Sequence, residues 1–143
     1  MIRKILNGEE HLIANDPVRP HIPFEKRVGE GREVFVLEGE DKIRAVICVA
    51  YTNDIPIDEE TLDNYTSAKG TNAIFYTVWS YDKGAGREIV NQGLRHLKEN
   101  KPLIKRFVTL SPLTDMAKNF HIRNGASLIS HNPESYNFEY PAS

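Results

Sequence analysis

Apolar and polar residues follow two different periods along this chain, one typical of strands and one typical of helices. Runs rich in β-branched and aromatic residues, separated by short polar or glycine-containing segments, predict β-strands. The strands expected on this basis are 32–38, 43–51, 72–80 and 103–110, followed by two short ones at 127–130 and 136–140. The second of these runs is apolar almost throughout, so we expect it to lie in the centre of a sheet.

Helical periodicity is found in two segments of the second half of the chain. Residues 87–100 carry apolar side chains at helical spacing. In the second segment the apolar residues fall at i, i+3, i+4 and i+7 and predict one apolar face; they are Leu113, Met116, Ala117 and Phe120. We expect Ser111 to cap this second helix, Pro112 to occupy its first position and residues 124–125 to end it.

The order of these elements indicates the fold class. A short surface helix is predicted at 57–62, and residues 16–31, with three prolines, are expected to form a long loop or a few broken turns. A hairpin comes first, followed by a strand–helix–strand crossover, a second helix and a closing hairpin. This order predicts an α+β fold with a mixed central sheet and helices packed on its faces. The length of 143 residues, without repeats or a flexible linker, predicts a single domain over 1–143.

Composition narrows the range of partners. Eighteen Lys and Arg against 20 Asp and Glu give a net charge of −2, which argues against nucleic-acid binding and against a polybasic membrane anchor. The longest apolar run is too short to span a membrane and the N-terminus lacks the apolar core of a secretion signal, so we expect a cytoplasmic protein. Cys48, in an apolar run, is expected to be a buried core residue. No spacing of His, Cys or carboxylates predicts a metal site.

A turn with the sequence Gly-Ala-Gly connects the third long strand to the helix that follows. Backbone amides and the dipole at a helix start attract anions, and glycine lets a phosphate approach the backbone closely. A pyrophosphate would bind the amides of Lys83, Gly84, Ala85, Gly86 and Arg87, with the two basic side chains adding charge. Taken alone, the motif is more simply interpreted as a plain turn, because glycine is common in turns.

The later helix carries a second motif, and the two together are more specific. Residues 117–126 read Ala-x-x-Phe-x-x-Arg-x-Gly-Ala. With the glycine turn, this strongly resembles the acetyltransferase superfamily called GNAT. Two positions differ from the common family pattern. Tyr81 stands where the turn usually has Arg or Gln, and His121 stands where the helix often has a Tyr that protonates the departing thiolate.

The GNAT resemblance implies a fold and a ligand. The fold is the GNAT-like acyl-CoA acyltransferase fold, and the ligand is acetyl-CoA or another acyl-CoA acting as co-substrate. Its pyrophosphate would rest on the turn 83–87. Its pantetheine arm would add like a strand beside the backbone of 77–80, where Val78 and Ser80 are the expected contacts. Such folds often pair, which leaves a homodimer open.

A narrower resemblance is to the malonyl-CoA decarboxylases, whose catalytic domain is GNAT-like. Residues 119–126, Asn-Phe-His-Ile-Arg-Asn-Gly-Ala, are similar to a stretch of that family, and so are 49–55, 73–76, 103–106 and 110–112. The matches occur in the family order and cover about residues 45–130. The resemblance implies that Ser111 and His121 are catalytic. Those enzymes are longer, with a helical N-terminal domain and a large insertion between the two motifs.

The residues themselves leave both assignments open. His121 is also explained as a histidine satisfied by carbonyls at the end of a helix, and Ser111 as a helix cap. Ten residues of continuous helix span about 15 Å, so the two side chains can bond directly only if the chain bends between 112 and 115. Thr109 is a reserve candidate. The strand 72–80 carries no carboxylate, which leaves a bound water or Glu38 as general base.

Three functional hypotheses follow from the GNAT and decarboxylase resemblances. The first is acetyl transfer from acetyl-CoA to a small-molecule or protein amine, with His121 as general acid. The second is a minimal malonyl-CoA decarboxylase-like lyase that uses Ser111 and His121. The third is a non-catalytic acyl-CoA-binding module. Residues 16–31 and 53–69 are expected to line the acceptor site.

Overall fold

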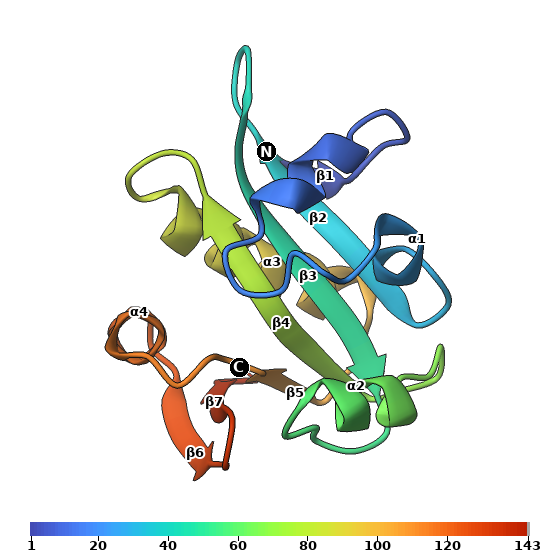
Figure 1. The fold of residues 1–143 in the computed structure, drawn as a ribbon, viewed down its shortest axis with the longest axis vertical. Helices are drawn as coiled ribbons and strands as arrows, with labels where there is room; N and C mark the ends of the chain where they lie inside the picture. Colours follow the sequence, from blue (N-terminus) through green and yellow to red (C-terminus); the bar gives the residue numbers. More distant parts are fainter. Residues whose placement is uncertain (143) are drawn as a thin grey trace.

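A seven-stranded mixed sheet with the order β1-β2-β3-β4-β5-β7-β6 runs through the molecule (Figure 1). The structure is a computed structural model and describes residues 1–142. The strands are β1 (Ile2–Lys4), β2 (Arg32–Glu38), β3 (Ile43–Thr52), β4 (Asn72–Ser80), β5 (Arg106–Thr109), β6 (Ser127–His131) and β7 (Tyr136–Tyr140). The helices are the 3-10 helix η1 (Glu10–Asn15), α1 (Phe24–Arg27), α2 (Glu59–Tyr65), α3 (Ala85–Asn100) and α4 (Asp115–Arg123). The predicted α+β class is confirmed.

The apolar strand β3 lies inside the sheet, as its sequence predicted. It pairs antiparallel with β2 and β4, and every residue from Ala45 to Thr52 is buried. Cys48 is among them, which confirms the predicted core position. The strand β1, three residues long, was not predicted because so short a segment has no readable period.

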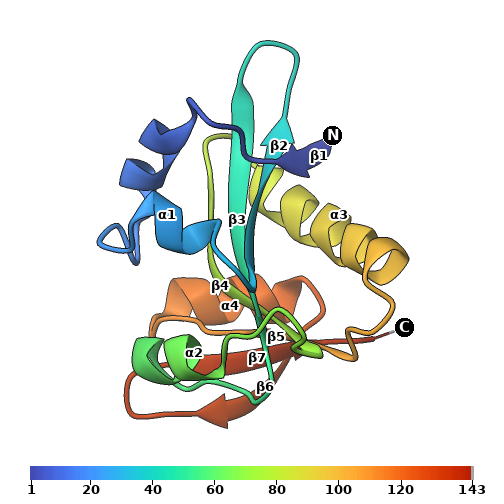
Figure 2. The same ribbon diagram turned by 90° about the vertical axis from the view of Figure 1, so that its right-hand side faces the viewer.

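Helices cover both faces of the sheet (Figure 2). On one face α3 packs Ile89, Val90 and Leu97 into a core with alternate residues of β2, β3 and β4. On the other face, η1, α1 and α2 cover a second core. The segment 16–31, predicted to be a long loop or a few broken turns, contains the short helix α1 among its turns. None of the helices within residues 1–142 is long and apolar enough to cross a membrane.

The sheet diverges between β4 and β5. These two strands run parallel, but β5 pairs only with residues 72–75 of β4. Beyond Phe75, β4 continues to Ser80 beside β3 and has no strand on its other edge among the described residues. The register between β3 and β4 also shifts at this level, and Tyr76 has no Cα partner on β3. The free edge of β4 begins at this irregularity.

The start of α4 differs from the prediction. The helix begins at Asp115, and its N-cap is Thr114, whose side chain accepts a hydrogen bond from the Ala117 amide at 3.1 Å. Ser111 is therefore not a helix cap. Its backbone instead exchanges two hydrogen bonds of 2.9 Å with Tyr136, so the chain stays extended past β5 before it turns into the helix. The prediction was wrong because a backbone partner brought by the distant β7 outweighed the local Ser-Pro signal.

Candidate functional site

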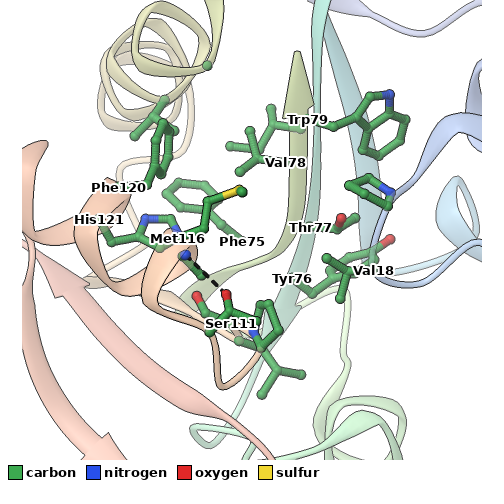
Figure 3. Close-up of a pocket in the computed structure, with 18 of the residues that line it drawn as sticks. Val18, Phe75, Tyr76, Thr77, Val78, Trp79, Ser111, Met116, Phe120 and His121 are labelled. Carbon is green, nitrogen blue, oxygen red and sulfur yellow. Dashed lines mark hydrogen bonds between the residues drawn. The ribbon is translucent and has the colours of Figure 1, made fainter. Parts of the chain in front are cut away.

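A cavity of about 700 Å³ opens where β4 and β5 diverge. Residues 75–80 of β4 form one wall, and α4 with residues 110–112 forms the opposite one (Figure 3). The segment 17–19 and the start of α3 complete the lining. The volume lies in the range of small-molecule and cofactor sites, and apolar side chains dominate the walls.

The wall formed by β4 offers an unpaired strand edge. Within residues 1–142, no strand pairs with residues 76–80 on that edge. Val78 and Ser80, predicted to contact a pantetheine arm, both line the cavity. An extended chain with amide groups can add to such an edge through main-chain hydrogen bonds. The divergence of the sheet therefore creates a slot suited to an amide-containing arm.

The glycine turn lies at one end of this slot. Gly84 has a φ of +83° and is the N-cap of α3, a conformation that favours glycine. The helix has no side-chain cap, and no acceptor among residues 1–142 is found for the amides of Gly86 and Arg87. Gly86 also lines the cavity, and a Cβ there would lie 3.2 Å from Cε1 of Phe120. Open amides at a helix start are able to bind an anion.

The charged residues around the turn leave its two basic side chains, Lys83 and Arg87, available to pair with a bound anion. The two nearby carboxylates are already paired: Asp82 with Lys42 at 2.6 Å, and Glu88 with Arg44 at 3.0 Å. Lys83 and Arg87 are exposed and form no ion pair with any described residue. The Tyr81 hydroxyl is engaged by other parts of the chain, since it accepts hydrogen bonds from the side chains of Trp79 and Asn15.

Of the seven predicted ligand-binding residues, three line the cavity (Val78, Ser80 and Gly86). The other four flank Gly86 in the turn.

His121 is the buried residue of α4 and forms part of the cavity wall. Its Nδ1 lies 2.7 Å from the Tyr140 hydroxyl, and its ring stacks on Phe138 with centroids 5.4 Å apart. No described residue forms a hydrogen bond with Nε2. Burial lowers the pKa of His121 to about 4, so the imidazole is neutral at pH 7 in the empty cavity. When the Tyr140 hydroxyl donates to Nδ1, the imidazole proton lies on Nε2.

Ser111 lines the same cavity but does not bond to His121. Its hydroxyl donates to Thr109 Oγ1 at 2.8 Å, and Thr109 Oγ1 also accepts from the Phe138 amide at 3.1 Å. Because α4 begins only at Asp115, the separation that a continuous helix would impose between Ser111 and His121 does not apply. The cavity is therefore lined by both predicted catalytic residues, Ser111 and His121, which form no hydrogen bond with each other.

Among the residues that the structure describes, none with a carboxylate side chain lines the cavity. Glu38, one suggested general base, lies at the exposed end of β2, where it pairs with Arg3 at 3.2 Å, and it does not reach the cavity. The charged residue of the lining is Arg19. Residues 53–69 do not line the cavity either, whereas 17–19 do. Within residues 1–142 there is no cluster of three or more His, Cys, Asp or Glu arranged to hold a metal ion.

Sequence reasoning missed Arg19 and Tyr140. Arg19 lies in a proline-rich segment without periodicity, and Tyr140 is one of several aromatic residues in the last strand. The alternation in 136–140 could have placed Phe138 and Tyr140 on one face. Nothing in the sequence pairs that face with His121.

Comparison with known proteins supports the resemblance stated from the motifs. No family model matches the chain. Goose (Anser anser anser) mitochondrial malonyl-CoA decarboxylase is 28% identical over an alignment of 135 residues that covers 82% of this chain and 26% of that protein. The malonyl-CoA decarboxylase structure from Agrobacterium vitis matches 84% of this chain and 35% of that one, with 23% identity and a TM-score of 0.66. The chain thus spans about a quarter to a third of these relatives.

A GNAT family acetyltransferase from Elizabethkingia anophelis, solved with acetyl-CoA bound, matches over nearly its whole length. The alignment covers 98% of this chain and 96% of that one, with 9% identity and a TM-score of 0.63. The chain therefore has the GNAT-like fold, as the motifs implied.

Proposed function

We propose that this protein binds an acyl-coenzyme A and acts on its acyl group. The observation that carries the proposal is the free edge of β4, which opens into the cavity between the glycine turn and His121. The pantetheine arm would lie along residues 77–80, and the pyrophosphate would meet the amides of Gly86 and Arg87. The thioester would then reach the part of the cavity lined by Ser111 and His121.

His121 would act first as a neutral hydrogen-bond donor. Its low pKa in the empty cavity makes the imidazolium scarce at pH 7. A neutral imidazole can still donate a hydrogen bond to a thioester oxygen and stabilise the charge that develops there. Negative charge forming beside the ring would raise the His121 pKa, which lets it hold a proton during the reaction.

Decarboxylation of a malonyl-type thioester is the first candidate reaction. The bond between the carboxylate carbon and the α-carbon breaks, CO₂ leaves, and the electron pair delocalises onto the thioester oxygen. The α-carbon then takes a proton from water, and acetyl-CoA is formed. This reaction needs no base to deprotonate an acceptor, which suits a cavity without a carboxylate. The similarity to malonyl-CoA decarboxylases also favours it.

Acetyl transfer to an amine is the second candidate, favoured by the near-complete overlap with a GNAT acetyltransferase. The amine attacks the thioester carbon, and the carbon–sulfur bond breaks. Water passes the proton of the amine to His121, whose pKa rises as negative charge forms beside it, and His121 then acts as general acid and passes that proton to the thiolate. A small-molecule amine fits the cavity directly, whereas a protein amine would enter from its open side.

Turnover assays separate these reactions. We expect CO₂ release from malonyl-CoA for decarboxylation, and thiol release from acetyl-CoA that depends on an added amine for transfer. In either case His121→Gln and Ser111→Ala should lower kcat at least tenfold, and Ser130→Ala outside the cavity should not. Binding of acetyl-CoA without turnover of either substrate would indicate a binding module. The absence of binding by calorimetry would overturn the proposal.

A further inference from the structure

We propose that Arg19 is the receptor for a carboxylate group of the substrate. This inference rests on the proposed function and adds a substrate class to it. Arg19 is 6% exposed and lines the cavity. Among the described residues of that lining it is the one with a charged side chain, and it is therefore the cation that an anionic substrate group would meet there.

A rigid turn holds Arg19 in place. The buried carboxylate of Asp16 accepts hydrogen bonds from the amides of Val18 and Arg19 and from the Thr77 hydroxyl, each at 2.9 Å. Asp16 also forms a fully buried ion pair with Arg27 at 2.8 Å. The turn is thereby tied to β4, and Figure 3 places Val18 beside Thr77, across the cavity from His121 and Met116.

The guanidinium of Arg19 is poorly satisfied by the protein. Nη1 donates to the Tyr76 carbonyl, and this is the one hydrogen bond found among its five N–H groups within residues 1–142. Nε is buried without a hydrogen-bond acceptor. Glu59 Oε2 lies 3.4 Å from Nε, but that carboxylate is 41% exposed and is also 2.6 Å from His21. A buried cation with unused donors favours a carboxylate ligand.

The charge at this position also bears on the identity of the substrate. Burial lowers the pKa of Arg19, while Glu59 and Asp16 oppose that shift, so a further anion beside the guanidinium would favour its charged form. The carboxylate could belong to the acyl group, as in a malonyl thioester, or to an acceptor such as an amino acid. A polycationic acceptor is disfavoured, because its charge would meet a buried cation.

Binding of unreactive analogues tests the acyl source. Calorimetry would compare S-carboxymethyl-CoA with S-ethyl-CoA, two thioethers that differ in the carboxylate. We expect the wild type to prefer the carboxymethyl compound at least tenfold and Arg19→Met to lose that preference while keeping its affinity for S-ethyl-CoA. Arg19→Lys should keep part of the preference and serves if the methionine variant does not fold. Arg95→Met, at an exposed arginine of α3, is the matched control.

A second titration tests the acceptor source. Glycine and glycinamide would be added to the S-ethyl-CoA complex, and a preference for glycine that Arg19→Met removes would assign the carboxylate to the acceptor. A wild type that shows neither preference overturns the inference, while retained S-ethyl-CoA binding leaves the proposed function standing. If S-ethyl-CoA itself fails to bind, both are overturned.

Discussion

The helices α3 and α4 each follow a strand that leads to the cavity, but they use their apolar residues differently. In α3, Ile89, Val90 and Leu97 are buried against the sheet. In α4 only His121 is buried, and Met116 is 83% exposed although it lies on the predicted apolar face. Met116, Ala117 and Phe120 line the cavity, and Phe120 also packs against the core that holds α3. An apolar helical face thus has two uses, and periodicity alone does not distinguish a core from a ligand site.

The contrast predicts different costs for removing apolar side chains. Leu97→Ala deletes a fully buried side chain of α3 and should lower the free energy of unfolding by about 3 kcal/mol. Met116→Ala, at an exposed position of α4, should change it by less than about 0.5 kcal/mol. Met116→Ala should weaken acyl-CoA binding, whereas Leu97→Ala should not at temperatures where it is folded.

Urea unfolding and calorimetry measure the two effects. Comparable losses of stability in both variants would show that α4 contributes to the core like α3. Unchanged ligand affinity in Met116→Ala would show that the exposed face of α4 does not contact the ligand.

The buried histidine of α4 predicts a pH-dependent stability. Its pKa is about 4 in the folded protein and near the ordinary 6.5 when unfolded. Above pH 6.5 both states are neutral and the group contributes nothing. As pH falls from 6.5 to 4, the unfolded state binds a proton that the folded state excludes, so stability decreases by up to about 3 kcal/mol.

Substitution of His121 tests this slope. His121→Gln should flatten the dependence of the unfolding free energy between pH 6.5 and 5, measured by urea titration. Tyr140→Phe removes the hydrogen bond but keeps the histidine, and it should keep the slope because burial is the cause of the lowered pKa. The interpretation fails if wild type and His121→Gln have the same slope.

The sequence predicted the elements better than their ends and contacts. The nearly continuous apolar run of 43–51 located the central strand, and the Gly-x-Gly turn and Asn-Phe-His motif marked two sides of one cavity. The start of α4 was wrong because Ser111 bonds to Tyr136, a contact 25 positions along the chain. Arg19 escaped notice because its place depends on Asp16, Thr77 and Arg27, which are joined only in the folded chain.

The caps of the two helices give the last and smallest predicted effect. Thr114 caps α4 through its side chain, whereas α3 begins at Gly84 with the amides of Gly86 and Arg87 open. If these amides bind the pyrophosphate with help from the neighbouring basic side chains, Lys83→Gln combined with Arg87→Gln should weaken acetyl-CoA binding about tenfold, or about 1.4 kcal/mol. The loss should shrink as salt rises, because exposed charges are screened. S-acetylpantetheine, which lacks the pyrophosphate, is the control ligand and should bind both proteins equally in calorimetry. If the double variant lost affinity equally for both ligands, the substitutions would act on the slot beside β4 and not on the pyrophosphate. If it lost affinity for neither ligand, the start of α3 would not be an anion site.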